Sequence, residues 1–327
     1  MLVRLEQWMK IGALRESDPN ENRVALVPET VERLVKAGHE LFIEHGAGTA
    51  AGFPDSDYLE AGAKNASATE IAGSVEILVH VQPPSSEEVA SLKKGCIVVS
   101  TLNARTNPSG VTGLASAGVT ALAMELVPRI ARAQRMDVLS SQASIAGYKA
   151  ALIAANSLGK YLPMMMTAAG TIPPAKVLVL GAGVAGLQAI ATTRRLGAVV
   201  EAFDVRAAAG EQVESLGAKF IQPPAAEDAE GAGGYARAQT EDEQAVQREF
   251  LKEHISQADA VITTAAIPGR PAPLLMTEDM VAVMKPGSVI IDLAAESGGN
   301  VAGTVAGEII VKNGVSINGP INVPSSM

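Results

Sequence analysis

Two stretches of this 327-residue chain carry side chains that could do chemistry. The first, residues 129–148, reads RIARAQRMDVLSSQASIAGY and holds Arg129, Gln134 and Asp137 at short intervals. A nicotinamide ring needs its carboxamide fixed by hydrogen bonds, which Arg and Gln can donate while an Asp holds them in place. The same residues also suit ordinary roles, because Asp137 can cap a following helix and arginines commonly lie in solvent. Spacing alone leaves both interpretations open.

The second stretch, GAGVAG at residues 181–186, is a Gly-x-Gly-x-x-Gly motif. It follows the apolar run VLVL, precedes a helical pattern that reaches about residue 196, and is followed by AVVEAF and then Asp204. In this motif Gly181 permits a tight turn, Gly183 lets the backbone approach a pyrophosphate, and Gly186 lets the helix pack closely on the strand. The helix N-terminus would hold the pyrophosphate, and Asp204 would accept hydrogen bonds from the adenosine ribose. We therefore predict a dinucleotide site.

Asp204 also bears on which dinucleotide binds, since a carboxylate there repels a 2′-phosphate. NAD(H) is therefore favoured over NADP(H). Arg206 leaves an alternative open, because an arginine two residues on can either accommodate a phosphate or serve as a solvated or paired charge.

Residues 223–244 read PPAAEDAEGAGGYARAQTEDEQ, a composition that predicts a long mobile loop. A tolerated surface insertion would have the same composition. Tyr235 follows two glycines, and an aromatic side chain on such a tip could cover a planar ligand.

These motifs need strands and helices to position them, and short β-rich runs do alternate with helical ones along the whole chain. In PETVERLVKAG, Pro28 suits a first helical turn, Val31, Leu34 and Val35 form one apolar face, and Gly38 suits the C-terminal end. Strands alternating with helices indicate mostly parallel sheets. The predicted fold class is α/β, with two Rossmann-like doubly wound parallel-sheet domains separated by a cleft and joined by long helices.

Length and composition fit two domains with aliphatic cores, since 47% of the residues are hydrophobic and 3% aromatic. The proline-free run after Asp137 predicts one long helix reaching about Tyr161. We place an N-terminal α/β domain at 1–137, completed by a C-terminal return at 310–327, and an NAD(H)-binding Rossmann domain at 138–309.

Several classes of function are disfavoured. The net charge of −9 argues against nucleic acid, whose affinity comes from basic residues. The single cysteine, Cys96, excludes a disulfide within the chain and favours a reducing compartment. No run reaches the ~18 apolar residues of a membrane span, so we expect a cytoplasmic protein without one. Neither HExxH nor GxSxG occurs, and we expect no metal.

The chain resembles the NAD(H)-binding component, domain I or the alpha-1 subunit, of proton-translocating NAD(P) transhydrogenase, in the alanine dehydrogenase/transhydrogenase family. The segments that carry the resemblance are RESDPNENRVALVPETV (15–31), RIARAQRMDVLSSQASIAGY (129–148), LPMMMTAAGTIPPAKVLVLGAGVAGLQAIATTRRLGAVVEAFDVR (162–206), EQVESLGAKFI (211–221) and the Gly-Gly-Tyr loop.

The resemblance implies that Arg129, Gln134 and Asp137 position the nicotinamide against NADP(H) on another component. It implies hydride transfer from NADH to NADP+, Re/Si-specific and coupled to proton translocation with a transmembrane component. It also implies a homodimer, peripheral to the inner membrane through its partners, and closure of the Tyr235 loop on bound NAD(H). The cofactor-binding residues that we expect are Gly181, Ala182, Gly183, Val184, Gly186, Asp204, Val205, Arg206, Ser140, Tyr148, Tyr235 and Ala266.

Two other functions stay open. Alanine dehydrogenase, an NAD-dependent amino-acid dehydrogenase, is similar and shares the early Arg15, but its pyruvate site needs a lysine and a histidine. This chain has His80 and Gln82 around the expected lysine and Asn103 near the expected histidine. His80 could substitute or could be a structural residue. The third possibility is a non-catalytic NAD(H)-binding module.

Members of the resembled family continue beyond NGPINVPSSM into further helices that complete the first domain. Either those helices lie outside this sequence, or the chain is a short variant.

Overall fold

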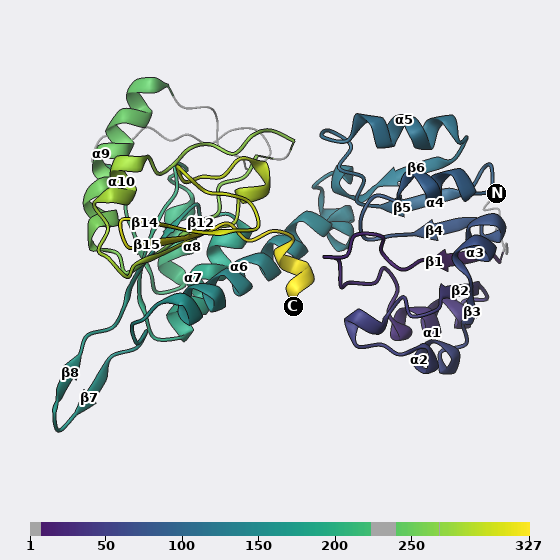
Figure 1. Ribbon diagram of the computed structural model, residues 1–327, viewed down its shortest axis with the longest axis horizontal. Helices are drawn as coiled ribbons and strands as arrows, with labels where there is room; N and C mark the ends of the chain where they lie inside the picture. The colour runs from purple at the N-terminus through teal and green to yellow at the C-terminus, as the bar shows by residue number, and fades with distance from the viewer. Residues whose placement is uncertain (1–7, 224–239, 268) are drawn as a thin grey trace. The chain divides into compact units, whose positions relative to one another are not determined.

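The computed structural model describes residues 8–223, 240–267 and 269–327, and the chain divides into two compact units, Met1–Val138 and Leu139–Met327. Each unit is built on a predominantly parallel sheet with helices between successive strands (Figure 1). The predicted α/β fold class with two doubly wound parallel sheets is confirmed.

The first unit contains a six-stranded sheet in the order β3-β2-β1-β4-β5-β6, in which every pair is parallel. The strand order reverses between β1 and β4. The strands are β1 (Lys10–Ala13), β2 (Glu40–Glu44), β3 (Lys64–Ala66), β4 (Ile77–Val79), β5 (Ile97–Ser100) and β6 (Thr120–Ala123). The helices are α1 (Pro28–Lys36), η1 (Thr49–Ala51), α2 (Asp55–Glu60), α3 (Ala68–Ser74), α4 (Ser86–Ser91), α5 (Pro108–Ser116), η2 (Met124–Leu126) and η3 (Ala131–Met136).

Helix α1 begins and ends where its residue types favour those events. Pro28 is its first residue, where a missing N–H costs nothing, and Gly38 adopts a φ of 95° just beyond the C-cap. Val31 is fully buried, and Leu34 and Val35 pack against the same core. The helix is therefore the one that the apolar spacing predicted.

The second unit contains a seven-stranded sheet in the order β11-β10-β9-β12-β13-β15-β14, with β14 alone antiparallel to its neighbour among the described residues. The strands are β9 (Lys176–Leu180), β10 (Val199–Phe203), β11 (Lys219–Phe220), β12 (Ala260–Thr263), β13 (Val289–Asp292), β14 (Ile309–Lys312) and β15 (Val315–Asn318). The helices are α6 (Val138–Ser157), α7 (Val184–Arg195), α8 (Ala209–Ser215), α9 (Glu241–Gln257), α10 (Glu278–Ala282), η5 (Ala295–Ser297) and η6 (Val323–Ser326).

The predicted return of residues 310–327 to the first domain is wrong. Strand β15 pairs with β13, and β14 pairs with β15, so this segment extends the second sheet. Asn313 and Gly314 join the two strands with φ values of 52° and 77°, the signature of a tight two-residue hairpin. Val315 and Ile317 are fully buried in the second unit's core, and this burial fixes the hairpin to its own sheet.

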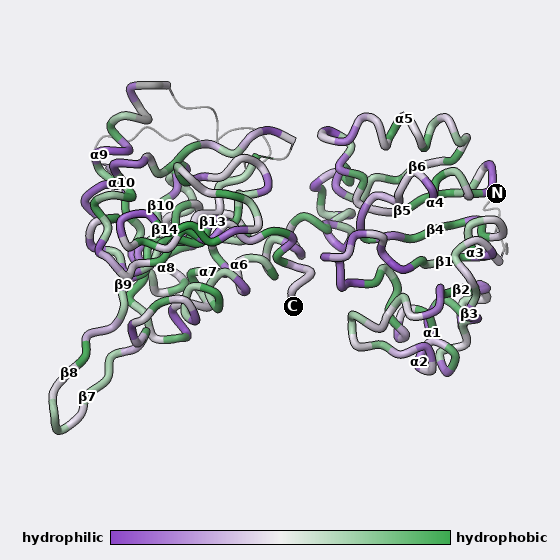
Figure 2. The backbone as a smooth tube through the Cα atoms, viewed as in Figure 1, coloured by the Kyte–Doolittle hydropathy of each residue, from purple (hydrophilic) through white to green (hydrophobic). Residues whose placement is uncertain are grey.

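Both faces of each sheet are covered. In β9, Val177 and Val179 belong to one buried cluster and Leu178 and Leu180 to another, as expected when side chains alternate along a strand between two helical layers. The apolar segments of the tube follow the strands in Figure 2.

Helix α6 ends at Ser157, four residues before the predicted Tyr161, and Gly159 lies just beyond its end. It packs closely on α7. A Cβ atom on Gly147 would lie 2.0 Å from the carbonyl oxygen of Ala185, which no rotamer change could relieve. Glycine at residue 147 therefore sets the distance between the two helices.

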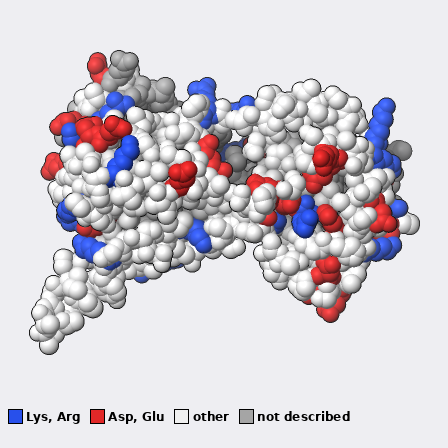
Figure 3. All heavy atoms as spheres, viewed as in Figure 1, with Lys and Arg blue, Asp and Glu red and all other residues white. Residues whose placement is uncertain are grey.

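A two-stranded hairpin, β7 (Met165–Thr167) and β8 (Gly170–Ile172), projects from the second unit (Figure 1). All six strand residues are exposed. No charged residue occurs between Lys160 and Lys176, so the arm is uncharged in Figure 3.

Within the described ranges no helix is long and apolar enough to cross a membrane. No group of His, Cys, Asp and Glu side chains in those ranges could hold a metal ion.

Candidate dinucleotide-binding site

The glycine turn lies between β9 and α7, as predicted. Gly181 has a φ of 100°, a conformation that L side chains rarely adopt. A Cβ atom on Gly186 would lie 1.8 Å from the carbonyl oxygen of Gly181, so α7 can begin this close to β9 only if residue 186 is glycine. Both glycines are therefore required by the protein's own backbone.

Gly183 is different, because the protein does not require a glycine there. Its φ is −75°, and an added Cβ would meet no heavy atom of the described residues within 4 Å. Gly183 caps the N-terminus of α7, where backbone N–H groups and the helix dipole favour an anion. Ala182 beside it is buried, whereas Val184 is 43% exposed. The open space at Gly183 fits a pyrophosphate that approaches the backbone.

Asp204 directly follows β10, and it is 6% exposed, with its carboxylate already hydrogen-bonded. It accepts hydrogen bonds from the backbone N–H of Ala182 at 2.7 Å and from the N–H of Arg206 at 2.9 Å. The guanidinium of Arg206 donates two more, from Nε and an Nη atom, each at 2.8 Å. The two candidate residues are thus brought together with the glycine turn, and Arg206 takes the role of a paired charge.

The pKa of Asp204 reflects this pairing. Burial alone would raise it, but the hydrogen bonds from Arg206 and Ala182 outweigh burial and hold the pKa below its ordinary value of 3.8. The carboxylate is therefore ionised at neutral pH, in the form that repels a 2′-phosphate. Val205, between the two residues, is half-buried and packs against the core.

The segment after β12 borders the glycine turn on the side away from β10. β12 pairs with β9 through Thr263 and Leu180, and the Thr264 hydroxyl donates to the carbonyl oxygen of Gly181 at 3.0 Å. Ala266, two residues on, is exposed. Ala266 was among the residues predicted from the sequence, whereas Thr264 was missed, because its only sequence signal was its place after an apolar strand.

Two further expected cofactor residues, Ser140 and Tyr148, lie on α6. Ser140 is half-buried in the first turn, and Tyr148 is 38% exposed two turns later, next to the glycine that contacts α7. Tyr235 lies outside the described residues.

Arg129, Gln134 and Asp137 lie around η3 in the first unit. Arg129 Nε is 3.9 Å from Asp137 Oδ2, and the backbone N–H of Asp137 donates to Gln134 O at 3.3 Å. Buried Ala133 anchors the segment, while Arg129 and Gln134 are exposed. Asp137 directly precedes α6, so it stands at the capping position and also within reach of Arg129.

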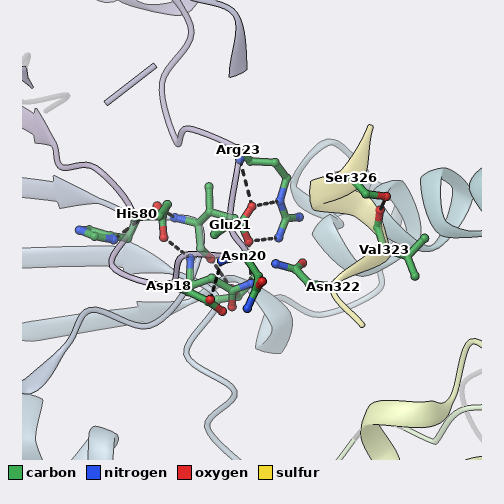
Figure 4. Close-up of polar contacts among 12 residues, drawn as sticks. Asp18, Asn20, Glu21, Arg23, His80, Asn322, Val323 and Ser326 are labelled. Carbon is green, nitrogen blue, oxygen red and sulfur yellow. Dashed lines mark hydrogen bonds and ion pairs between the residues drawn. The ribbon is translucent and has the colours of Figure 1, made fainter. Parts of the chain in front are cut away.

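The region that matters for a dehydrogenase lies in the first unit, and Figure 4 labels Glu21, Arg23 and His80 of this region. Glu16, buried after β1, accepts the backbone N–H groups of Val81 at 2.7 Å and Gln82 at 3.0 Å. The Gln82 side chain donates to Glu21 at 2.8 Å, and Glu21 is paired with Arg23 at 2.6 Å. The loop that follows β4 is thus held by the buried carboxylates of Glu16 and Glu21.

His80 follows β4 and is buried, with Nδ1 3.4 Å from Glu16 Oε1. That is an ion-pair distance, but neither ring nitrogen has a hydrogen-bond partner among the described residues. Asn103 is exposed in a left-handed conformation with a φ of 50°. His80 is therefore a buried residue and Asn103 a turn residue.

A cavity of about 480 Å³ in the first unit is lined by two arginines and five carboxylates. The charged residues that line it are Arg15, Glu16, Asp18, Glu21, Arg23, Glu44 and Glu88. The cavity holds more negative than positive charge, which disfavours an anionic substrate there.

Comparison with known proteins covers nearly the whole chain. The family model described as alanine dehydrogenase/PNT, N-terminal domain, matches residues 12–146, and that described as alanine dehydrogenase/PNT, C-terminal domain, matches residues 150–327. The first portion of the NAD(P) transhydrogenase alpha subunit of Rhodospirillum rubrum is 51% identical over 325 residues, which cover 97% of this chain and 85% of that protein.

Two further comparisons agree. The crystal structure of transhydrogenase from Sinorhizobium meliloti superposes with a TM-score of 0.87 at 48% identity, covering 97% of this chain and 88% of that one. The alanine dehydrogenase of Bacillus subtilis is 31% identical over 89% of this chain and 72% of its own length. The chain therefore belongs to the alanine dehydrogenase/PNT family.

Proposed function

We propose that the chain is the NAD(H)-binding component of an NAD(P) transhydrogenase and passes hydride from NADH to NADP+ bound on a partner component. The cofactor is NAD(H). The observation that carries the proposal is the glycine turn with Asp204 beside it, since an ionised carboxylate at that position repels a 2′-phosphate and favours NAD(H). The 51% identical relative named as a transhydrogenase alpha subunit supports the same reaction.

In this proposal the chain contributes positioning. Bound NADH supplies the hydride, and no acid or base is needed when the acceptor is a second nicotinamide. Arg129 and Asp137 orient the carboxamide of the ring, and exposed Gln134 is the residue closest to the hydride path. Holding two reactants in a near-attack geometry can lower a barrier by ~7–11 kcal/mol.

We further propose that the transfer is Re/Si-specific and coupled to proton translocation by a transmembrane component. The chain would act as a homodimer on the cytoplasmic side, peripheral to the inner membrane through its partners. Ser140, Tyr148 and Ala266 would line the cofactor site, and the loop carrying Tyr235 would close on it. Sedimentation velocity tests the dimer, since a protein that sediments as a monomer at micromolar concentration would contradict it.

Amino-acid dehydrogenation is disfavoured by the loop that follows β4. An ammonium group is missing at Gln82, whose side chain is instead bonded to Glu21, and Asn103 cannot act as a general acid. Pyruvate would therefore lack both its charge anchor and its proton donor. Reductive amination of pyruvate with ammonia and NADH in the absence of any partner would contradict the transhydrogenase assignment.

The decisive assay measures hydride transfer to NADP+ by stopped flow, from NADH or from an NADH analogue whose absorbance differs from that of NADPH, with a purified NADP(H)-binding transhydrogenase component present or absent. Replacing Gln134 with Leu should slow transfer at least roughly a hundredfold, while the Kd for NADH stays within about twofold. Arg135→Gln, one residue on and also exposed, is the matched control and should transfer hydride normally. A Gln134 variant that loses affinity but not rate would exclude this role.

A further inference from the structure

Asn300 is a fully buried polar residue, and both the nitrogen and the oxygen of its side-chain amide hydrogen-bond to the backbone of Ala265. Its Nδ2 donates to the carbonyl oxygen of Ala265 at 2.9 Å, and its Oδ1 accepts the N–H of Ala265 at 3.0 Å. The second Nδ2 hydrogen goes to Pro273 O at 2.8 Å. The amide thus pairs with Ala265 as a neighbouring strand would, and at neutral pH no other residue type offers that donor and acceptor at this length.

The backbone of Asn300 is itself held by Asp292, a fully buried carboxylate at the end of β13. Asp292 Oδ2 accepts the N–H of Asn300 at 2.8 Å and the hydroxyl of Thr304 at 2.7 Å. Its Oδ1 accepts the hydroxyl of Thr263 at 2.9 Å, on the adjoining strand β12. Hydrogen bonds therefore run without a gap from the sheet through Asn300 to Ala265.

Ala265 lies where the second half of a dinucleotide would pass. Its neighbour Thr264 is bonded to Gly181 O, while Asp204 flanks the same turn on the β10 side. A dinucleotide that crosses the carboxyl edge of such a sheet has its adenosine on one side of the glycine turn and its nicotinamide nucleotide on the other. With the adenosine at Asp204, the segment 264–266 borders the nicotinamide half.

The bonding pattern also determines which backbone groups stay available. Both backbone polar groups of Ala265 are taken by Asn300, whereas Ala266 is exposed and its N–H and C=O make no hydrogen bond with any described residue. Free backbone groups at the edge of a pocket are the usual polar contacts of a cofactor.

We propose that Asn300 is a positioning residue that holds the Ala266 peptide in place for the nicotinamide half of NAD(H). This inference rests on the proposed function. Once Asn300 is replaced, the segment 264–266 is free to adopt other conformations. The apparent affinity for NADH then falls in proportion to the fraction of molecules in the binding-competent conformation. Because the adenosine contacts at Asp204 do not depend on this segment, the loss should spare ligands that lack a nicotinamide.

The test compares NADH with ADP, binding measured by fluorescence titration and by calorimetry respectively. Replacing Asn300 with Leu, similar in size but without the amide, should weaken NADH roughly tenfold or more and leave ADP within about twofold. Thr304→Val is the matched control, since it removes a hydrogen bond from the same carboxylate without touching Ala265. It should bind both ligands normally.

A second variant separates positioning from general damage. Asn300→Asp keeps the acceptor for Ala265 N–H but sets a charge against two carbonyl oxygens. Burial and the carbonyl oxygens of Ala265 and Pro273 would raise the pKa of the introduced carboxyl, and its protonated form regains one donor. NADH affinity of this variant, divided by that of the wild type at each pH, should therefore recover as pH falls from about 8 to about 5.5.

Each outcome of these measurements supports or overturns the positioning role of Asn300. A selective loss for NADH with acid recovery in the Asp variant supports the role. Equal losses for NADH and ADP, or wild-type affinity for NADH in the Leu variant, would overturn it while leaving the dinucleotide site standing. A wild-type protein that binds neither ligand would remove the proposed function itself, and this inference with it.

Discussion

At the residue scale, the three glycines of the turn do different work. Gly181 and Gly186 are needed by the fold, because of a φ of 100° and a backbone contact of 1.8 Å, whereas Gly183 is free of both constraints. The motif predicted correctly the tight turn at Gly181 and the close packing of the helix on the strand at Gly186. It could not say which glycine serves the protein and which serves a ligand, since that difference lies in the space around each Cβ position.

This difference gives a paired prediction. Gly183→Ala should unfold at the same urea concentration as the wild type yet bind NADH at least roughly tenfold more weakly, because its methyl group occupies ligand space. Gly186→Ala should instead lose roughly 1–3 kcal/mol or more of the free energy of unfolding. Urea titrations beside NADH titrations check both, and unimpaired NADH binding by Gly183→Ala would count against a pyrophosphate there.

Asp204 yields a prediction about acid. Its folded pKa is lowered below 3.8, so the carboxylate stabilises the native state above that pH and the contribution is lost as pH falls through the lower, folded value. Asp204→Asn should be about 1–3 kcal/mol less stable near neutral pH. The gap should close between about pH 5 and about pH 2. Urea unfolding of both proteins across that range measures the difference in stability. A difference that stays constant would mean that the stabilising contact between Arg206 and residue 204 does not depend on the charge of Asp204.

At the scale of elements, strands that are continuous apolar runs are easier to recognise in the sequence than strands that are not. β9, β12 and β13 are buried on both faces, and their runs VLVL, AVIT and VIID stand out from their surroundings. The exposed hairpin β7–β8 carries no such contrast. Recognising β14 and β15 from the sequence required reading Asn313-Gly314 as the turn of a hairpin. That local signal would have placed residues 310–327 in the second domain.

The polar network beneath the site could not be predicted. Asn300, Asp292 and Ala265 are brought together from three segments, and two of the partners are backbone groups that leave no trace in residue type. The sequence did offer one signal of this network. Asp292 at the end of β13 occupies a position like that of Asp204 directly after β10.

The approach of α6 to α7 gives a prediction for a pair of helices. Gly147→Ala should lower the free energy of unfolding by roughly 1–3 kcal/mol, because the new methyl group meets a backbone oxygen. Gly73→Ala, in α3, is the control, since its methyl group would meet no described atom within 4 Å. It should gain up to about 1 kcal/mol from helix propensity. Chemical denaturation of both variants checks this, and equal stabilities would show that α6 can shift freely.

At the scale of the whole molecule, the chain consists of two units with separate cores, and the residues proposed for the adenosine half of the cofactor all lie in the second. A ligand that binds only native protein stabilises it by about 2.7 kcal/mol at a hundred times its Kd. Scanning calorimetry with saturating ADP should therefore raise the unfolding temperature of the second unit and leave that of the first unchanged. A single transition that moves as one would show that the units unfold together.

The strand order of the second sheet also governs how the chain acquires structure during its synthesis. β9 lies between β10 and β12, and the backbone N–H of Lys176 at its start bonds to Asp259, 83 positions later. A ribosome that adds about 5–20 residues per second leaves β9 waiting roughly 4–17 s for this neighbour. During that interval one edge of the apolar strand KVLVL is unpaired, and Thr264 has not yet been added beside the glycine turn. Bound cofactor therefore cannot stabilise the nascent second unit during that interval, because the site that would bind it is completed only when β12 arrives.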